Sequence, residues 1–251
     1  MRRKLIAAAA VLLAAVTLAG CGGGGDANTL RVGTEGTYSP FSYQGTDGKL
    51  TGYDIEVVQA VGAKLGKNVE FVQTPWDSIF AGLEAKRFDL VANQVTINDE
   101  RKAKYDLSEP YTVSEGVIVT RADNTDITSL ADLKGKTTAQ SATSNWAQVA
   151  RDAGANVEAV EGFVQTAQLL KDGRVDATVN DTLAVGEYQK TRNDGAVKIA
   201  GTTGDTSEQA FAALKDSGLM PDVNRALDEL RADGTLKQIS DKYFGSDVNG
   251  A

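Results

Sequence analysis

Residues 51–95 read TGYDIEVVQAVGAKLGKNVEFVQTPWDSIFAGLEAKRFDLVANQV, and this stretch decides the fold class. Its first part repeats apolar side chains at the spacing of one helix face, at Ile55, Val58, Val61 and Leu65. Thr51 or Asp54 can cap the start of this helix, and Gly66 can end it because glycine accepts the conformation that follows many helices. We therefore predict an amphipathic helix with one buried face.

Strands and a second helix flank this helix. Residues 30–33 and 69–73 are short runs with branched or aromatic side chains, which predict strands. A second helix is predicted to start at Asp77-Ser78 and to run through Leu83, and residues 90–95 predict another strand. Alternation of strand and helix is typical of a mostly parallel sheet with helices on its faces.

The second half repeats the alternation without repeating the sequence. The predicted elements are strands at 116–121, 136–140, 157–160 and 176–179, a helical turn at 129–133, and helices at 145–153, 166–171, 221–232 and 236–243. Two such units in about 225 residues suggest two lobes. Because ligands of open α/β sheets sit outside the carboxyl ends of the strands, we expect a cleft between the lobes.

Composition excludes several kinds of chemistry. The chain has 251 residues with 26 Lys and Arg, 34 Asp and Glu, one Cys and no His. A Ser-His-Asp triad, a Cys-His pair and a His-ligated zinc are therefore impossible. The formal net charge is −8, and an acidic chain without a basic run argues against nucleic acid as a partner.

The N-terminus predicts secretion and anchoring. Residues 1–20 combine a basic start with a short apolar run, as in a signal peptide. The junction Leu18-Ala19-Gly20-Cys21 resembles a bacterial lipobox, in which the Cys is acylated after cleavage. Residues 21–28 then form the lipidated Cys and a flexible tether, which places the protein on the extracytoplasmic face of the membrane. The alternative is an ordinary signal peptide followed by a chance Cys.

Several stretches together resemble the family 3 extracellular solute-binding proteins. They are residues 32–41 (VGTEGTYSPF), 47–54 (DGKLTGYD), 89–94 (DLVANQ) through Arg101, 107–111 (LSEPY), 133–136 (LKGK), 173–177 (GRVDA) and 231–235 (RADGT). Each stretch is common alone, and their joint order carries the resemblance, which covers residues 30–245. Proteins of this family serve amino-acid ABC importers.

The resemblance implies a two-lobed α/β periplasmic-binding-protein fold of type II. Lobe one would comprise residues 29–114 plus 210–251, and lobe two residues 115–209. Two hinge strands, near residues 113–117 and 208–212, would join the lobes. The ligand cleft would lie between them and close when the ligand binds.

An amino acid presents a carboxylate and an ammonium group, so its receptor needs a cation and an anion in a dry cleft. Arg101 matches the family arginine that grips the carboxylate; without the resemblance, a surface ion pair would be the expectation. Asp181 matches the family acid that takes the ammonium; alone, it would be an ordinary helix N-cap.

Further positions match the backbone-holding part of the family site. Asn93, Gln94 and Thr96 match strand-end residues that hydrogen-bond the ligand. Thr143 and Ser144 match a loop at a helix N-terminus that also holds the carboxylate, although capping residues have the same composition.

Aromatic and acidic positions complete the expected site. Tyr38 and Trp76 match aromatic residues that flank the ligand, with core packing as the alternative. Trp76, between Pro75 and Asp77 at a helix start, is poorly placed for a core. Glu35 lies where the family varies with specificity, so it would bind a polar or ammonium-bearing group, or be solvated.

Specificity is suggested by departures from the commoner family pattern. Residues 93–96 (NQVT), 104–106 (KYD), 111–114 (YTVS) and 139–145 (AQSATSN) look most like the cystine-binding branch. The predicted function is binding of a polar amino acid, best L-cystine, and its delivery to an ABC permease. Glu35 or Asn145 would serve the second polar end of cystine. A monomer with neither cofactor nor metal is expected.

Two other functions stay open. Some relatives of the fold are enzymes such as cyclohexadienyl dehydratases, and Glu35 would then be the general acid. A ligand-sensing component would bind without an adjacent transporter.

Overall fold

The computed structural model describes residues 28–192 and 194–250. The predicted signal peptide, the lipidation site Cys21 and most of the tether lie outside the described residues. Within the described ranges, no helix is both long and apolar enough to cross a bilayer.

Helices and strands alternate along the chain, as the sequence predicts. The strands are β1 (Thr29–Thr34), β2 (Thr37–Tyr38), β3 (Ser42–Gln44), β4 (Leu50–Thr51), β5 (Asn68–Gln73), β6 (Leu90–Thr96), β7 (Tyr105–Leu107), β8 (Thr112–Arg121), β9 (Thr137–Gln140), β10 (Asn156–Ala159), β11 (Ala177–Asp181) and β12 (Val197–Leu214). The helices are α1 (Tyr53–Lys64), α2 (Trp76–Glu84), α3 (Asp99–Lys104), α4 (Asn145–Asp152), α5 (Phe163–Lys171), α6 (Thr182–Arg192), α7 (Met220–Ala232) and α8 (Thr235–Phe244), with a 3-10 turn at Leu130–Leu133.

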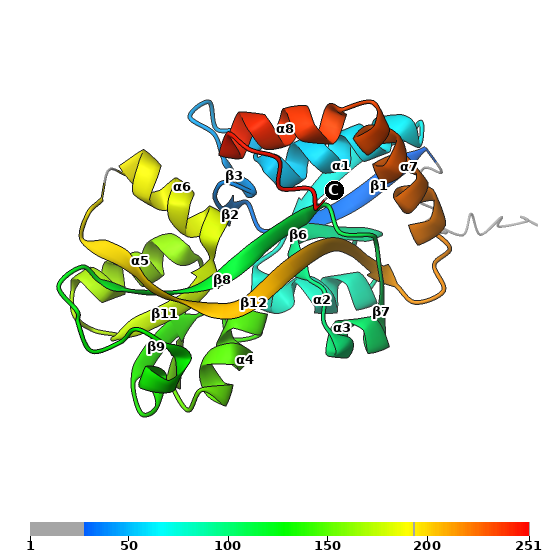
Figure 1. The fold of residues 1–251 in the computed structure, drawn as a ribbon. Coiled ribbons are helices and arrows are strands. Elements are labelled where there is room, and N and C mark those ends of the chain that lie inside the picture. The colour runs from blue at the N-terminus through cyan, green and yellow to red at the C-terminus, as the bar shows by residue number, and fades with distance from the viewer. Residues whose placement is uncertain (1–27, 193, 251) are drawn as a thin grey trace, which may run out of the picture.

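One mixed sheet runs through the molecule in the order β10-β9-β11-β8-β12-β6-β1-β5 (Figure 1). β1 pairs in parallel with β5 and β6, which confirms the parallel arrangement predicted for residues 30–95. The sheet as a whole is not mostly parallel, because β8 and β12 pair antiparallel with each other and with their neighbours. β2, β3 and β4 form a separate small sheet.

The long strands β8 and β12 run side by side between the two halves of the molecule (Figure 1). β12 pairs with β6 and β7 near its C-terminal end and with β8 along most of its length. The register between β8 and β12 shifts at two places, between Ile199 and Gly201 and between Thr202 and Thr206. The two strands therefore connect the halves.

Each half has its own apolar core on both faces of the sheet, which gives two lobes. In the first lobe, α1, α7 and α8 pack together on one face and α2 covers the other. In the second lobe, α5 and α6 lie over one cluster, and α4 with the 3-10 turn lies over the other. The two-lobed α/β fold is thus confirmed.

Several predicted helix starts are wrong by one to three residues: α5 begins three residues earlier than predicted, and α7 and α8 each begin one residue earlier. The N-cap of α1 is Gly52, without a side-chain cap, rather than Thr51 or Asp54. A side chain at Gly52 would have its Cβ only 2.2 Å from the carbonyl oxygen of Phe41, so glycine is required by close approach. α2 begins at Trp76, directly after Pro75. Asp54 has a different role, described below.

Candidate functional site

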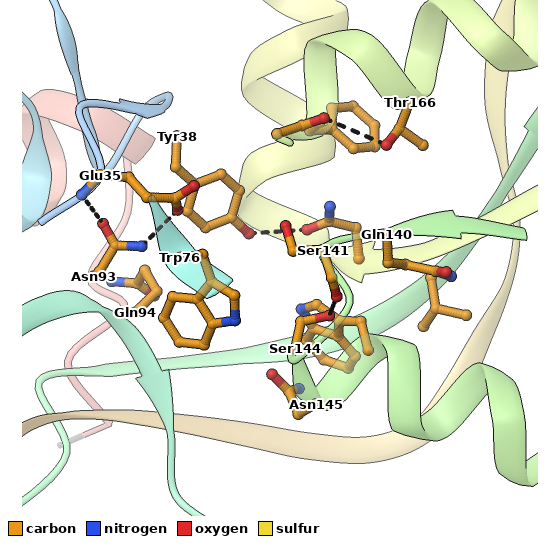
Figure 2. A pocket seen from close by; sticks show the side chains of 15 residues that line it. Glu35, Tyr38, Trp76, Asn93, Gln94, Gln140, Ser141, Ser144, Asn145 and Thr166 are labelled. Atoms are coloured by element: carbon orange, nitrogen blue, oxygen red, sulfur yellow. Dashed lines mark hydrogen bonds between the residues drawn. The ribbon is translucent and has the colours of Figure 1, made fainter. Parts of the chain in front are cut away.

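A cavity lies between the lobes (Figure 2). The first lobe contributes side chains from the ends of its strands and from the start of α2. The second contributes the loop before α4, the start of α5 and the end of β11. The lining residues are Glu35, Tyr38, Trp76, Asn93 and Gln94 from the first lobe, and Gln140, Ser141, Ser144, Asn145, Trp146, Gly162, Phe163, Thr166, Val179 and Asn180 from the second.

Glu35 is held on the cavity wall by Asn93. The Asn93 side chain donates to Glu35 Oε2 at 2.8 Å, and its Oδ1 accepts from the Glu35 backbone N–H at 2.8 Å (Figure 2). Burial raises the pKa of the Glu35 carboxyl, although the hydrogen bond from Asn93 acts in the opposite direction. The cavity thus offers one carboxyl group with a fixed orientation.

Arg101 is a buried cation without a carboxylate partner. Asn98 caps α3 by accepting from the Arg101 backbone N–H at 2.8 Å, and this cap places Arg101 in the first turn. Its Nη1 donates to the Thr96 carbonyl at 2.8 Å, and Cζ lies 5.2 Å from the Trp76 ring centroid. The side chain is 7% exposed, and burial lowers its pKa to about 10. No salt bridge joins it to another residue of the described chain, so the surface ion pair considered from the sequence does not form.

Arg101 lines a second hollow, which is open to solvent and meets the cavity at Ser144, Asn145 and Trp146. Thr96 and Thr143 also line this second hollow. Trp76 contacts both regions: its ring faces the guanidinium, and it lines the cavity as well. The carboxyl group of Glu35 lines the cavity, and the cation of Arg101 lines the adjoining hollow.

Trp76 both packs in the core and lines the cavity, contrary to the expectation that it is poorly placed for a core. Its ring belongs to the apolar cluster under α2 and is 7% exposed. Its indole Nε1–H has no hydrogen-bond partner within the described chain. A buried indole N–H usually finds a partner, so a polar ligand atom would satisfy it.

Asp77, next to Trp76, joins the lobes. Its Oδ1 accepts from the backbone N–H of Thr143 at 3.0 Å and from Thr143 Oγ1 at 2.7 Å, and its Oδ2 accepts from the Ala142 N–H at 3.3 Å. Ser144 shapes the same loop by capping α4: its Oγ accepts from Ala147 N–H at 3.0 Å and donates to the Ser141 carbonyl at 2.8 Å. The capping alternative for Ser144 is therefore observed.

A second contact crosses between the lobes at the other side of the cavity. Tyr38 donates its hydroxyl proton to Asn180 Oδ1 at 2.9 Å (Figure 2). Leu183 and Ala184, at the start of α6, pack against the apolar core of the first lobe. Together with the Asp77 bonds, these contacts hold the lobes together around the cavity.

Asp181 is not among the described residues that line either hollow. Its carboxylate accepts from Ser114 on β8, from Gln209 Nε2 on β12 at 3.4 Å, and from the Leu183 N–H at 2.8 Å. It is 3% exposed, and burial raises its pKa to about 6 against the effect of these hydrogen bonds. In this conformation Asp181 caps α6 and bonds both hinge strands, as the helix-cap alternative predicts.

The structure thus brings nine of the ten predicted ligand residues to the two hollows and leaves Asp181 outside them. Sequence reasoning missed most of the lining from the second lobe, including Gln140, Trp146 and Asn180. A signal was present, since Asn180 adjoins the predicted Asp181 and Gln140 and Trp146 lie within four residues of the predicted Ser144. Among the described residues, no three Asp, Glu or Cys side chains gather as metal ligands would.

The chain is similar in sequence to proteins of known function. The model of the bacterial extracellular solute-binding proteins, family 3, matches residues 30–246. The L-cystine-binding protein TcyA of Bacillus subtilis (strain 168) is 49% identical over 267 residues, which cover 98% of this chain and 99% of TcyA.

Solved structures agree. An ancestral arginine-binding protein bound to arginine has 40% identity and a TM-score of 0.81, covering 87% of this chain and 99% of the other. The L-cystine solute receptor of Neisseria gonorrhoeae in the unliganded open conformation has 46% identity and a TM-score of 0.60, covering 89% and 95%. Of these two structures, the cystine receptor is more similar in sequence to this chain but superposes on it less well.

Proposed function

The chain belongs to the bacterial extracellular solute-binding proteins of family 3, and from this we propose that it binds L-cystine between its lobes and delivers it to an ABC import permease. It acts outside the cytoplasmic membrane, as the family description states. The observation that carries the proposal is a cavity between the lobes that presents the carboxyl group of Glu35 and adjoins a hollow lined by the buried guanidinium of Arg101, which forms no salt bridge within the described chain; Trp76 lines the cavity and its ring faces Arg101.

Cystine is favoured as the ligand for two reasons. The relative TcyA and the gonococcal receptor both carry L-cystine in their names. Cystine also has two zwitterionic ends, so it can pair with charged side chains that lie apart from each other. We assign one carboxylate of the ligand to Arg101 and one ammonium to Glu35, with Asn93, Thr96, Thr143 and Ser144 as hydrogen-bonding neighbours and Tyr38 as a flanking ring.

Asp181 keeps a part in the proposal. Its carboxylate is occupied by Ser114 and Gln209 in the present conformation, so the other ammonium group would reach it only if these bonds rearranged. Gln94 contributes to the cavity wall near its strand end.

The mechanism we propose is lobe closure without a chemical step. Lobe one comprises residues 29–114 and 210–251, lobe two residues 115–209, and β8 and β12 bend between them. The better superposition on an arginine-bound relative than on a more similar open receptor supports a closed present conformation. A ligand favours that conformation because only closure completes both sets of contacts.

The lipid anchor is part of the proposal. Acylation of Cys21 would hold a monomer at the membrane, where a permease can meet it. We expect radiolabelled palmitate to label the wild-type chain in bacterial cells and the labelled protein to sediment with membranes. Cys21→Ser should lose the label; a Cys21→Ser chain that keeps the label would contradict the anchor.

Thermal unfolding tests the ligand. The purified protein, unfolded and refolded to remove bound ligand, is heated with L-cystine, L-cysteine, L-arginine, L-glutamine or prephenate. We expect L-cystine to raise the unfolding midpoint as its concentration rises, since it binds only the native state. A higher unfolding midpoint with L-arginine alone would contradict the assignment of L-cystine as the ligand. Consumption of prephenate would instead favour an enzyme that uses Glu35.

A further inference from the structure

Gln94 has a backbone conformation that is unusual inside a strand. Its φ is +50°, a left-handed value that is unfavourable for residues with a Cβ atom. It lies in β6, where the register with β12 shifts between Ala210 and Ala212. An irregularity of this kind turns the main chain locally and is often found beside a functional site.

Asp54 holds this irregular backbone in place. From the first turn of α1, its Oδ2 accepts from the Gln94 backbone N–H at 2.8 Å and its Oδ1 accepts from Gln94 Nε2 at 2.6 Å. Gln94 Nε2 also donates to Thr112 Oγ1 at 3.1 Å, on β8. Asp54 is fully buried, so its carboxylate serves Gln94 rather than solvent.

The backbone conformation of Gln94 affects the cavity through the preceding residue, Asn93. Asn93 is bonded to Gln94 by one peptide unit, and its side chain fixes both the backbone and the carboxylate of Glu35. Figure 2 shows Asn93 directed toward Glu35, with Gln94 beside it. A change in the backbone at Gln94 therefore moves the amide that orients the only carboxyl group among the cavity's lining residues.

We propose that Asp54 is a positioning residue for ligand binding: it stabilises the left-handed Gln94 and thereby sets the place of Asn93 and Glu35 on the cavity wall. Asp54 itself touches no ligand. The inference rests on the proposed function in one respect, since affinity for the ligand is what it changes.

A double-mutant cycle separates positioning from plain structural support. Asp54→Asn replaces one accepting oxygen by a donor that faces the donors of Gln94, and we expect about tenfold weaker L-cystine binding by calorimetry. Glycine adopts a positive φ without support. In a Gln94→Gly background, Asp54→Asn should therefore change affinity by less than about twofold.

The matched control lies on the same turn of α1. Glu56 accepts hydrogen bonds from Tyr243 and Lys242 on α8, away from the cavity. Glu56→Gln should leave the affinity for L-cystine unchanged, whatever it does to the unfolding midpoint. Should Asp54→Asn fail to fold, the comparison of Gln94→Ala with Gln94→Gly gives the same test, and alanine should bind more weakly than glycine.

Equal losses of affinity from Asp54→Asn in both Gln94 backgrounds would overturn the inference, as would a lower midpoint with unchanged affinity. An alanine variant that binds as well as the glycine variant would also overturn it. If the wild-type protein binds L-arginine or L-glutamine and not L-cystine, the proposed ligand is wrong. The same cycle measured with that amino acid would then decide the role of Asp54.

Discussion

At the scale of single residues, burial determines what each charged group does. The sequence marks Arg101 through its motif and through Asn98 before it. In the described chain its guanidinium is surrounded instead by the Thr96 carbonyl of β6 and by the rings of Trp76 and Phe80 of α2, two elements other than its own helix. The spacing of residues along the chain cannot reveal such a neighbourhood.

Replacing Arg101 should separate ligand binding from stability. Arg101→Met should weaken L-cystine binding by at least about 30-fold, because truncating one partner of a buried charge pair costs about 2 kcal/mol or more. The unliganded protein should be at least as stable as wild type, since a buried charge without a counter-charge is unfavourable. Calorimetry and urea unfolding measure both. Lys102→Met, on the exposed side of the same helix, is the control; equal binding by both variants would contradict the role of Arg101.

Asp181 predicts a pH dependence of stability. Burial raises its pKa from 3.8 to about 6, so the native protein binds this proton more tightly than the unfolded chain does. Its contribution to the free energy of unfolding is fully present below about pH 4 and is lost as the pH rises through about 6. Asp181→Asn should flatten this part of the profile in urea unfolding at several pH values. A slope equal to that of wild type would show that Asp181 is not the group responsible.

At the scale of elements, sequence patterns predicted those with a clear apolar period. α1, α2, α7, β5 and β6 were found with small errors at their ends. α6 was missed because its sequence, TLAVGEYQKTR, has a weak apolar face. Most of β12 was missed because residues 201–206 are polar or glycine and are partly exposed where the strand passes between the lobes. Because this segment is buried on neither face, it lacks the alternation of apolar and polar residues that predicts a strand.

The contact between α2 and the loop before α4 predicts a kinetic effect. Asp77→Ala removes all three hydrogen bonds that hold Ala142 and Thr143, and Thr143→Val removes one of them without altering α2. Both should speed ligand dissociation, the first by about tenfold, because closure loses hydrogen bonds that the open form does not make. Stopped-flow fluorescence can follow Trp76 and Trp146, which both line the cavity. Unchanged dissociation in both variants would rule out this contact as a latch.

At the scale of the whole molecule, the order of helices and strands predicted two lobes, but it did not predict which residues join them. The contacts that close the cavity, Tyr38 with Asn180 and Asp77 with Thr143, join residues more than 60 positions apart. Such pairs become visible only once β8 and β12 have fixed the geometry between the lobes. For the same reason, the sequence indicated most of the residues that line the two hollows and not which of them join the lobes.

Calorimetric titration of L-cystine into the refolded, ligand-free protein tests directly whether the cavity binds this amino acid. We expect saturable binding of one L-cystine per chain, with no comparable heat from L-arginine or L-glutamine. We also expect small-angle X-ray scattering of the same samples to show a smaller radius of gyration with L-cystine, as the lobes close. No heat with L-cystine, together with binding of another amino acid, would contradict the proposed function.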